Sequence, residues 1–298
     1  MLPGADLRVV VTAAGPIEVA ISGDGPALLA LHGAMGGWDQ GLLLARSLGA
    51  RALRCVAPSR PGYLGTPLSV GRTPQSQADA YAAVLDALGV EAAAVAAVSG
   101  GGPSAVQFAL RHPARCRALV LVSAATIGGI PTRLPLAWYA MRLAARVPPL
   151  AAAMRRKAAR DPEASARRSI PEAALRERTL RDPEAGPLLR ALQASTLDRM
   201  ALRLPGTEVD IETGRADLAP ALERISVPVL AVHGTADPAA PFAQAEAVAA
   251  RAPGAELLAV PGGGHVALFT HLAPIRARVG AFLAAHALRG EAAAARRA

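Results

Sequence analysis

One sharp transition constrains how this chain can fold. An apolar run over residues 92–98 stops at Ser99, three glycines follow it directly, and from Pro103 onward the apolar residues have helical spacing. This pattern predicts a strand that feeds a helix through a tight turn, with one hydroxyl at the apex. The two backbones nearly touch in such a turn, so the positions two residues before and after the apex must be very small. Ala97 and Gly101 meet that requirement.

The turn by itself leaves two other interpretations open. A glycine-rich connection between a strand and a helix can be purely structural, and it can also hold a phosphate group. The chain contains a similar stretch at residues 20–25, where Ser22 lies among small residues between two short β-like runs. No helix follows that stretch, so we expect a hairpin or connecting turn there. The role of Ser99 therefore has to be judged from the rest of the chain.

Strands and helices are predicted to alternate on both sides of Ser99. Short β-like runs occupy residues 7–14, 17–22, 27–31, 52–57, 92–98, 118–122, 227–232 and 256–260. Helical spacing occupies residues 38–48, 75–88, 103–111, 241–251 and 266–287. Such alternation indicates right-handed βαβ units around a mostly parallel sheet. We therefore predict an α/β fold: a mostly parallel, eight-stranded twisted sheet flanked by helices, with the first two strands paired at its edge.

The alternation is interrupted between residues 127 and 217, where no convincing strand occurs. This region consists of prolines, alanines and arginines at helical spacing, and it is broken at Pro148-Pro149, Asp161-Pro162, Ile170-Pro171, Asp182-Pro183 and Pro205-Gly206. Proline ends or kinks a helix, so these positions predict four or five short helices. We expect an inserted, all-helical cap over residues 127–217 on a core domain formed by residues 1–126 and 218–298. A frayed tail is expected over residues 289–298.

The composition excludes several classes of protein. With 298 residues, 52% of them hydrophobic and only 18% charged, the chain can bury a large core and is not disordered. The net charge is +9, and residues 131–205 carry fourteen arginines and Lys157 against seven acids. An aromatic content of 3% leaves few side chains on which bases could stack, so we predict no nucleic-acid partner. We interpret the excess of arginine as a bias in amino-acid composition that comes from the source genome. Binding of an acidic partner to the cap stays open as an alternative.

Features that are missing from the sequence bear on where in the cell the protein acts and on which cofactors it binds. No apolar run approaches the length of a membrane helix, and the first residues do not join a basic region to an apolar one, so we expect neither membrane association nor a signal peptide. Cys55 and Cys116 lie far apart beside predicted strands, which favours reduced core thiols and a cytoplasmic protein. No cluster has metal-ligand spacing and no phosphate-binding lysine motif occurs, so we predict no metal and no cofactor.

Two further residues follow strands that are predicted to lie near Ser99. Chemistry in an open parallel sheet gathers at the carboxyl ends of the strands. Asp237 lies in the loop after the predicted strand 227–232, and His265 comes after strand 256–260 and three glycines. Taken singly, each has a structural alternative, namely a helix-capping aspartate and a solvated histidine. Together they supply an imidazole that can take a serine proton and a carboxylate that can orient the imidazole.

With these residues in this order, the chain resembles the α/β-hydrolase-fold family of serine hydrolases over nearly its whole length. The resemblance implies that Ser99 is the nucleophile, His265 the general base and acid, and Asp237 the orienting carboxylate. Ala97 departs from the glycine that is usual two residues before the nucleophile, and we expect it to strain the turn slightly. Ser104, one turn into the helix, is interpreted as a packing or capping residue.

The resemblance also implies an oxyanion hole, a pair of amides that stabilise negative charge on the substrate oxygen. One amide belongs to Gly100, and the other comes from the His32-Gly33-Ala34 loop, most plausibly from Ala34 rather than from Gly33 or Met35. His32 is expected to brace that loop without titrating in catalysis. The segment Ser59–Tyr63 resembles another loop of the family and is interpreted as a structural signature without chemistry of its own.

These residues predict a serine hydrolase that cleaves a small or medium carboxylic ester through an acyl-enzyme, with the small-molecule substrate enclosed between the sheet and the cap. A serine at position 99 argues against a dehalogenase or an epoxide hydrolase, which use aspartate. Three alternatives stay open: a carbon–carbon bond hydrolase of ring-cleavage products, a cofactor-free haloperoxidase-like enzyme, and a non-catalytic binding protein of the same fold.

Residues outside this set are interpreted more simply. His112, His233, His271 and His286 are expected in loops or at the surface, without a catalytic role. Substrate specificity is expected to lie in the cap. Four of its residues are interpreted as packing the cap helices together in preference to lining a substrate pocket: Trp138, Met141, Met154 and Met200. Arginines such as Arg142, Arg146 and Arg199 are expected to be solvated.

Overall fold

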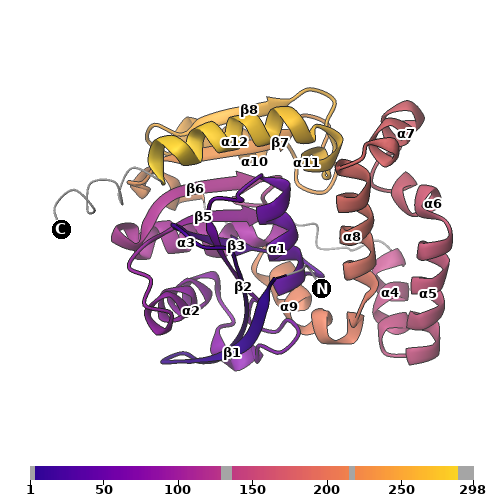
Figure 1. Cartoon of the computed structure of the whole chain (residues 1–298), viewed down its shortest axis with the longest axis horizontal. Coiled ribbons are helices and arrows are strands. Elements are labelled where there is room, and N and C mark those ends of the chain that lie inside the picture. Colours follow the sequence, from indigo (N-terminus) through magenta and orange to yellow (C-terminus); the bar gives the residue numbers. More distant parts are fainter. Residues whose placement is uncertain (1–3, 129–135, 215–218, 288–298) are drawn as a thin grey trace.

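The computed structural model describes residues 4–128, 136–214 and 219–287. Within them, eight strands form one sheet in the order β1-β2-β4-β3-β5-β6-β7-β8 (Figure 1). The strands are β1 (Asp6–Thr12), β2 (Gly15–Ser22), β3 (Ala27–Leu31), β4 (Arg54–Pro58), β5 (Ala93–Val98), β6 (Cys116–Val122), β7 (Val229–Gly234) and β8 (Glu256–Val260). Only the pairs β1·β2 and β2·β4 are antiparallel. The predicted α/β fold with a mostly parallel, eight-stranded sheet is confirmed.

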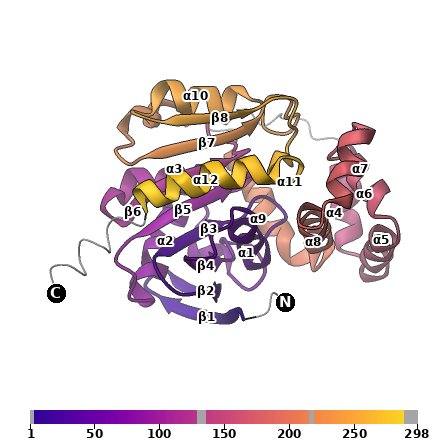
Figure 2. The same ribbon diagram turned by 45° about the horizontal axis from the view of Figure 1, so that its top comes forward.

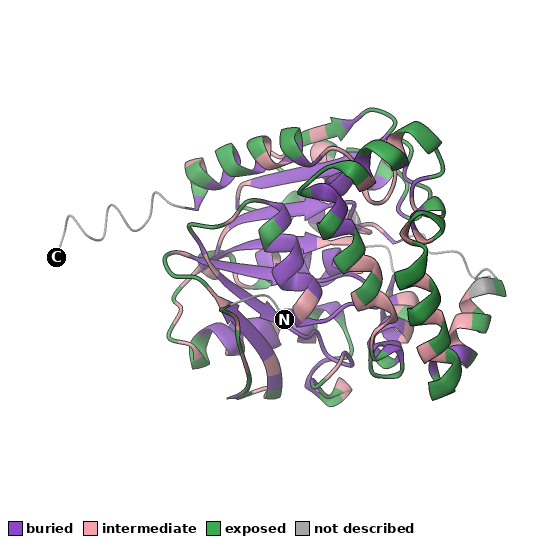
Figure 3. Ribbon diagram, turned by 45° about the vertical axis from the view of Figure 1, so that its right-hand side comes forward, coloured by how far each residue is buried: buried purple, intermediate pink, exposed green. Residues whose placement is uncertain are grey.

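Helices cover both faces of this sheet (Figure 2). One face packs against α1 (Trp38–Ser47) and α12 (Leu272–His286), and the other packs against α2 (Pro74–Ala87), α3 (Gly102–Arg111) and α10 (Ala243–Arg251). Successive side chains of a strand point to opposite faces of the sheet. Because helices cover both faces, the side chains of the central strands are buried on both sides (Figure 3). This explains why they read as continuous apolar runs instead of alternating ones.

The described residues between β6 and β7 form helices and no strand. They are α4 (Leu136–Ala145), α5 (Pro148–Arg160), α6 (Pro162–Arg167), α7 (Ala173–Arg181), α8 (Ala185–Leu197) and α9 (Met200–Thr213), with a short 3₁₀ helix at Ala219–Arg224. These six α-helices in the described residues exceed the four or five that the sequence led us to expect. In Figures 1 and 2, α9 lies closer to the sheet than α5 and α6 do. The predicted end of the cap at residue 217 and the predicted tail at residues 289–298 lie outside the described residues.

Most predicted helix boundaries agree with the structure, but two do not. The four proline breaks between residues 148 and 183 fall at ends of helices, whereas Pro205-Gly206 lies inside α9. The helix continues because the Gly206 amide donates to the carbonyl of Gly62 at 2.9 Å, outside the helix. The single helix expected at 266–287 is divided at His271 into α11 (Ala267–Thr270) and α12.

Both cysteines are free and buried, as predicted. Burial raises the pKa of the Cys55 thiol to about 12 and that of Cys116 to about 12, so neither is a reactive thiolate at neutral pH. No helix in the described ranges has the length and apolar character needed to cross a bilayer.

Candidate active site

Ser99 lies at a strained turn between β5 and α3. Its backbone has a φ of 51°, in the left-handed region that a non-glycine residue rarely adopts. The residues that follow it form a single 3₁₀ turn before α3 begins at Gly102. A Cβ at Gly101 would lie 2.7 Å from the His32 carbonyl oxygen, so only glycine fits there. The tight turn inferred from the sequence is present, with Ala97 fully buried before it.

The structure brings His265 and Asp237 to Ser99 from the ends of β8 and β7. The His265 Nε2 atom lies 3.0 Å from the Ser99 hydroxyl oxygen. On the other side of the imidazole ring, Nδ1 lies 2.9 Å and 3.1 Å from the two carboxylate oxygens of Asp237. The ionised carboxylate can only accept, so Nδ1 carries the proton and the Nε2 lone pair faces the serine hydroxyl. A serine, a base and an orienting acid thus form a continuous hydrogen-bonded chain.

Asp237 is buried but well supplied with donors. Backbone amides of Ala239 and Ala240 donate to its Oδ1 atom at 2.8 Å and 3.0 Å. Burial alone would raise the pKa of Asp237, but hydrogen bonds from His233 and His265 and from the Ala240 amide hold it well below its usual range. The carboxylate is therefore ionised throughout the neutral range, as an orienting acid must be.

We expect Asp237 to stabilise the fold at neutral pH and to lose this contribution in acid. An unperturbed aspartate has a pKa of about 3.9, and that of Asp237 is lower, so the native state binds fewer protons than the unfolded chain between these values. The contribution is fully present above the unfolded-state pKa and declines as the pH falls through the folded-state pKa. Urea unfolding of the wild type and Asp237→Asn should give a difference in free energy that shrinks below about pH 4. A difference independent of pH would contradict this.

His233 was expected in a loop or at the surface, and this expectation was wrong. It lies in β7, it is 2% exposed, and its Nε2 atom donates to the Ala240 carbonyl at 2.8 Å. The same Nε2 atom is 3.4 Å from Asp237 Oδ2. Its position four residues before Asp237, at the end of an apolar strand, was the signal that could have indicated burial.

The other histidines lie away from Ser99. His112 follows α3 and its Nε2 atom contacts Asp79 at 2.8 Å. His286 is exposed at the end of α12, and His271 separates α11 from α12. Across the described ranges, no group of three or more histidine, cysteine or acidic side chains is placed to hold a metal ion.

The backbone of the loop after β3 passes directly beside the serine. A Cβ at Gly33 would lie 3.0 Å from the Ser99 Cβ, and a Cβ at Gly100 would lie 3.3 Å from the Ala34 amide nitrogen. Among the described residues, the Ala34 amide donates to no acceptor, whereas the Met35 amide donates to Thr207 at 2.9 Å. Ala34 and Gly100, the two amides implied by the resemblance, thus lie together next to the Ser99 hydroxyl, and Met35 is already engaged.

His32 is buried behind this loop, and burial and the nearby Arg60 lower its pKa well below the usual value. The neutral ring donates from Nδ1 to the Gly33 carbonyl at 2.7 Å and accepts at Nε2 from the Arg60 amide at 2.9 Å. These bonds fix one tautomer. The contacts are those of a residue that braces the loop, as the sequence led us to expect.

A small cavity of about 160 Å³ opens beside Ser99. It is lined by Gly33, Ala34, Gln40, Leu43, Leu44, Val98, Ser99, Val122, Leu192, Thr196, His265, Val266, Leu268 and Phe269. Leu192 and Thr196 come from α8, so one helix between β6 and β7 reaches the serine. Met141, Met154, Met200 and Trp138 pack with Met35 and Leu204 instead and do not line this cavity.

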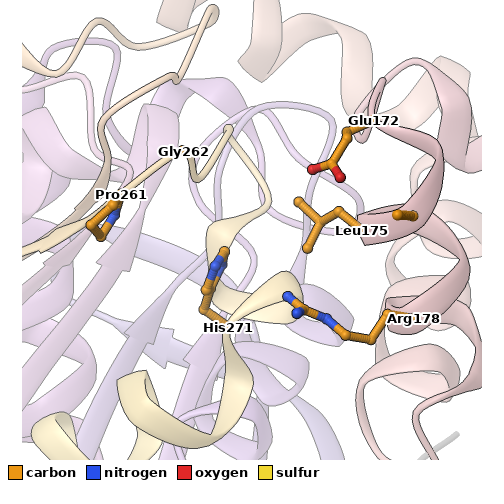
Figure 4. Close-up of a pocket in the computed structure, with 7 residues that line it drawn as sticks. Glu172, Leu175, Arg178, Pro261, Gly262 and His271 are labelled. Atoms are coloured by element: carbon orange, nitrogen blue, oxygen red, sulfur yellow. The ribbon is translucent and has the colours of Figure 1, made fainter.

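A second hollow, of about 280 Å³, lies apart from the serine and shares no lining residue with the cavity beside Ser99 (Figure 4). It lies between α7 and the loop after β8, and Arg178 extends across it toward His271. Burial and the charge of Arg178 lower the pKa of His271. Ser99 and His265 line the cavity described above and not this hollow, so the candidate site is that cavity.

The comparisons with known proteins agree with this fold. Residues 28–279 match the family model described as the alpha/beta hydrolase family. The chain belongs to this family. An alpha/beta hydrolase fold protein from Nakamurella multipartita shares 35% sequence identity with it and superimposes with a TM-score of 0.82. The match covers 92% of this chain and 97% of that one, so this alpha/beta hydrolase has a close structural counterpart along nearly its full length.

Two curated relatives match a shorter part of this alpha/beta hydrolase. An uncharacterized hydrolase of Bacillus subtilis (strain 168), YcgS, is 33% identical over 112 residues, which cover 38% of this chain and 39% of that protein. The 2-hydroxymuconate semialdehyde hydrolase of Pseudomonas sp. (strain CF600) is 33% identical over 125 residues, covering 40% and 44%. The chain thus spans about two fifths of the length of the curated relatives it matches.

Proposed function

We propose that this alpha/beta hydrolase is a serine hydrolase that cleaves a small or medium carboxylic ester through an acyl-enzyme. The observation that carries the proposal is the hydrogen-bonded chain from the Ser99 hydroxyl through His265 to the Asp237 carboxylate. A serine hydroxyl is a weak nucleophile until a neighbouring base takes its proton, and this arrangement supplies that base and holds it in one tautomer.

Each residue then has one part in the reaction. His265 Nε2 takes the Ser99 proton as the hydroxyl oxygen attacks the ester carbonyl, and Asp237 stabilises the imidazolium that forms. The negative charge on the carbonyl oxygen is met by the amides of Ala34 and Gly100. Each such donor lowers the barrier by about 3 kcal/mol in enzymes where it has been removed. His265 then returns the proton to the leaving alcohol. In the second half of the reaction, His265 takes a proton from water as the water attacks the acyl carbon, and returns that proton to the Ser99 oxygen as the acid product leaves.

The size and the lining of the cavity favour a substrate with a small, uncharged group on one side of the ester. Its volume of about 160 Å³ is well below the roughly 300–1,000 Å³ of pockets that enclose drug-sized ligands. The lining residues are mainly aliphatic or aromatic, and no arginine or lysine is among those the structure describes around it. A carboxylate on this part of the substrate would lose its water without gaining a counter-charge.

We therefore expect short acyl esters to be hydrolysed faster than long ones. The kcat/KM for p-nitrophenyl butyrate should exceed that for the decanoate by roughly tenfold or more, since the extra methylenes exceed the volume of this small apolar pocket. Leu192→Ala removes a lining side chain from α8 and should move the preference toward longer chains. Equal kcat/KM values along the series, unchanged in Leu192→Ala, would contradict this use of the cavity.

Carbon–carbon bond hydrolysis is a second candidate with the same nucleophile. It is favoured by the likeness to the Pseudomonas 2-hydroxymuconate semialdehyde hydrolase, at 33% identity over 125 residues. Assaying a ring-cleavage product beside the p-nitrophenyl esters separates the two. Ser99-dependent turnover of the ring-cleavage product alone would favour this alternative over ester hydrolysis.

A further inference from the structure

A buried ion pair lies directly behind the two candidate oxyanion amides. Arg60, in the loop that the sequence suggested is only structural, is 1% exposed and pairs with Asp210 of α9. Its Nη1 atom donates to Asp210 Oδ1 at 3.1 Å, its Nη2 atom bonds Oδ2, and the Tyr63 hydroxyl donates to the same Oδ2 at 2.6 Å. Burial opposes the charge of Arg60, but Asp210 and Tyr63 raise its pKa, so the guanidinium is charged.

Arg60 touches the backbone on both sides of the candidate oxyanion hole. Its Nη1 atom donates to the Gly100 carbonyl at 2.9 Å. Its own amide donates to His32, whose other ring nitrogen holds the Gly33 carbonyl. The Gly33 carbonyl and the Ala34 amide belong to one planar peptide and point in opposite directions. Fixing the carbonyl therefore aims the Ala34 amide.

Helix α9 supplies a second contact to the same loop. The Thr207 hydroxyl accepts from the Met35 amide at 2.9 Å and donates to the Arg203 carbonyl of its own helix at 2.8 Å. Thr207 is 2% exposed, so water does not replace either bond. The peptide that follows Ala34 is therefore fixed by α9.

The backbone of α9 is joined to the loop that carries Arg60. The Gly206 amide donates to Gly62, and the Leu202 carbonyl, its usual partner within a helix, accepts instead from the Leu64 amide at 2.8 Å. A Cβ at Gly206 would overlap the Tyr63 ring, so the glycine permits this close approach. Helix and loop form one unit, which holds Asp210 at a fixed place beside Gly100.

We propose that Asp210, acting through Arg60, and Thr207, acting through Met35, are positioning residues for the Gly100 and Ala34 amides, so that α9 completes the oxyanion hole. This inference rests on the proposed function, because it assumes that these amides receive the negative charge of the reaction. It assigns a part in turnover to a helix that contributes no residue to the serine cavity.

The test compares variants that loosen the amides with matched variants that do not. Thr207→Val removes the acceptor for the Met35 amide at constant shape, and Thr207→Ser restores it. Thr213→Val is the matched control, because Thr213 makes the same bond to its own helix at 2.8 Å without contacting the loop. Asp210→Asn weakens the buried ion pair between Asp210 and Arg60.

With p-nitrophenyl butyrate, Thr207→Val and Asp210→Asn should lower kcat by roughly tenfold to a hundredfold and leave KM within about twofold, since only transition-state contacts are lost. Affinity for a trifluoromethyl ketone, which forms the tetrahedral adduct, should fall in proportion to kcat/KM. Thr207→Ser should regain the wild-type kcat, and Thr213→Val should keep it. If Asp210→Asn fails to fold, the Thr207 series decides the question.

Two results would overturn the proposal: a wild-type kcat in folded Thr207→Val, or an equal loss of kcat in Thr213→Val. Both results are compared with the hydrolytic activity of Ser99→Ala. If Ser99→Ala keeps full activity, the proposed function itself has failed. If hydrolysis depends on Ser99 but Thr207→Val has a wild-type kcat, the function stands and only the positioning roles are rejected.

Discussion

Replacing Ser99 by alanine should abolish ester hydrolysis while leaving the fold intact. The substitution removes only the hydroxyl oxygen, which lies 3.0 Å from His265 Nε2. Loss of the nucleophile of a serine hydrolase lowers kcat by about 10⁵- to 10⁶-fold. Hydrolysis of p-nitrophenyl butyrate measures this loss, and circular dichroism verifies the fold.

Ser22→Ala is the matched control for this experiment. Ser22 also lies among small residues, but it ends β2, where it pairs with Cys55 of β4, and no histidine lies near it in the sequence. We expect its activity to equal that of the wild type. Equal rates for Ser99→Ala and the wild type would reject Ser99 as the nucleophile and, with it, the hydrolytic mechanism.

His265→Ala should lower kcat almost as far, by about 10⁴- to 10⁶-fold, because the serine proton then has no acceptor. The half-buried ring follows a glycine-rich loop and fills little core volume, so the thermal unfolding temperature should change only slightly. Covalent labelling of Ser99 by a fluorophosphonate should slow in parallel, since it requires the same activated hydroxyl.

His286→Ala is the matched control for His265→Ala, since His286 is exposed at the end of α12 and does not line the cavity beside Ser99. Its hydrolysis and labelling rates should stay at wild-type values. Labelling of His265→Ala at the wild-type rate would show that another group activates Ser99, and the assignment of His265 as the base would be lost.

The sequence was sufficient to predict the sheet and the residues grouped at its edge, for local reasons. The run that forms β3 is apolar at every position, which only a strand buried on both faces requires. Ser99, Asp237 and His265 each follow a strand of the parallel part of the sheet, and parallel strands bring their carboxyl ends to one edge. The mostly parallel sheet and the grouping of these residues at its edge followed from pattern and fold type together.

The support behind the site could not be predicted in the same way. Arg60 and Asp210 are separated by 150 residues, and no local pattern indicates that an arginine in one loop is neutralised by an acid on a distant helix. Pro205-Gly206 reads as a helix end, and only the contact with Gly62 shows why the helix continues. Each of these depends on long-range packing, which periodicity does not encode.

The left-handed backbone at Ser99 sets an evolutionary constraint on this protein. A serine there holds a conformation that glycine adopts at about 1 kcal/mol lower cost. A population selected only for thermal resistance would therefore tend to replace this proposed nucleophile with glycine and to lose the proposed activity as it gained stability. Continued presence of the serine at this position requires selection on turnover itself.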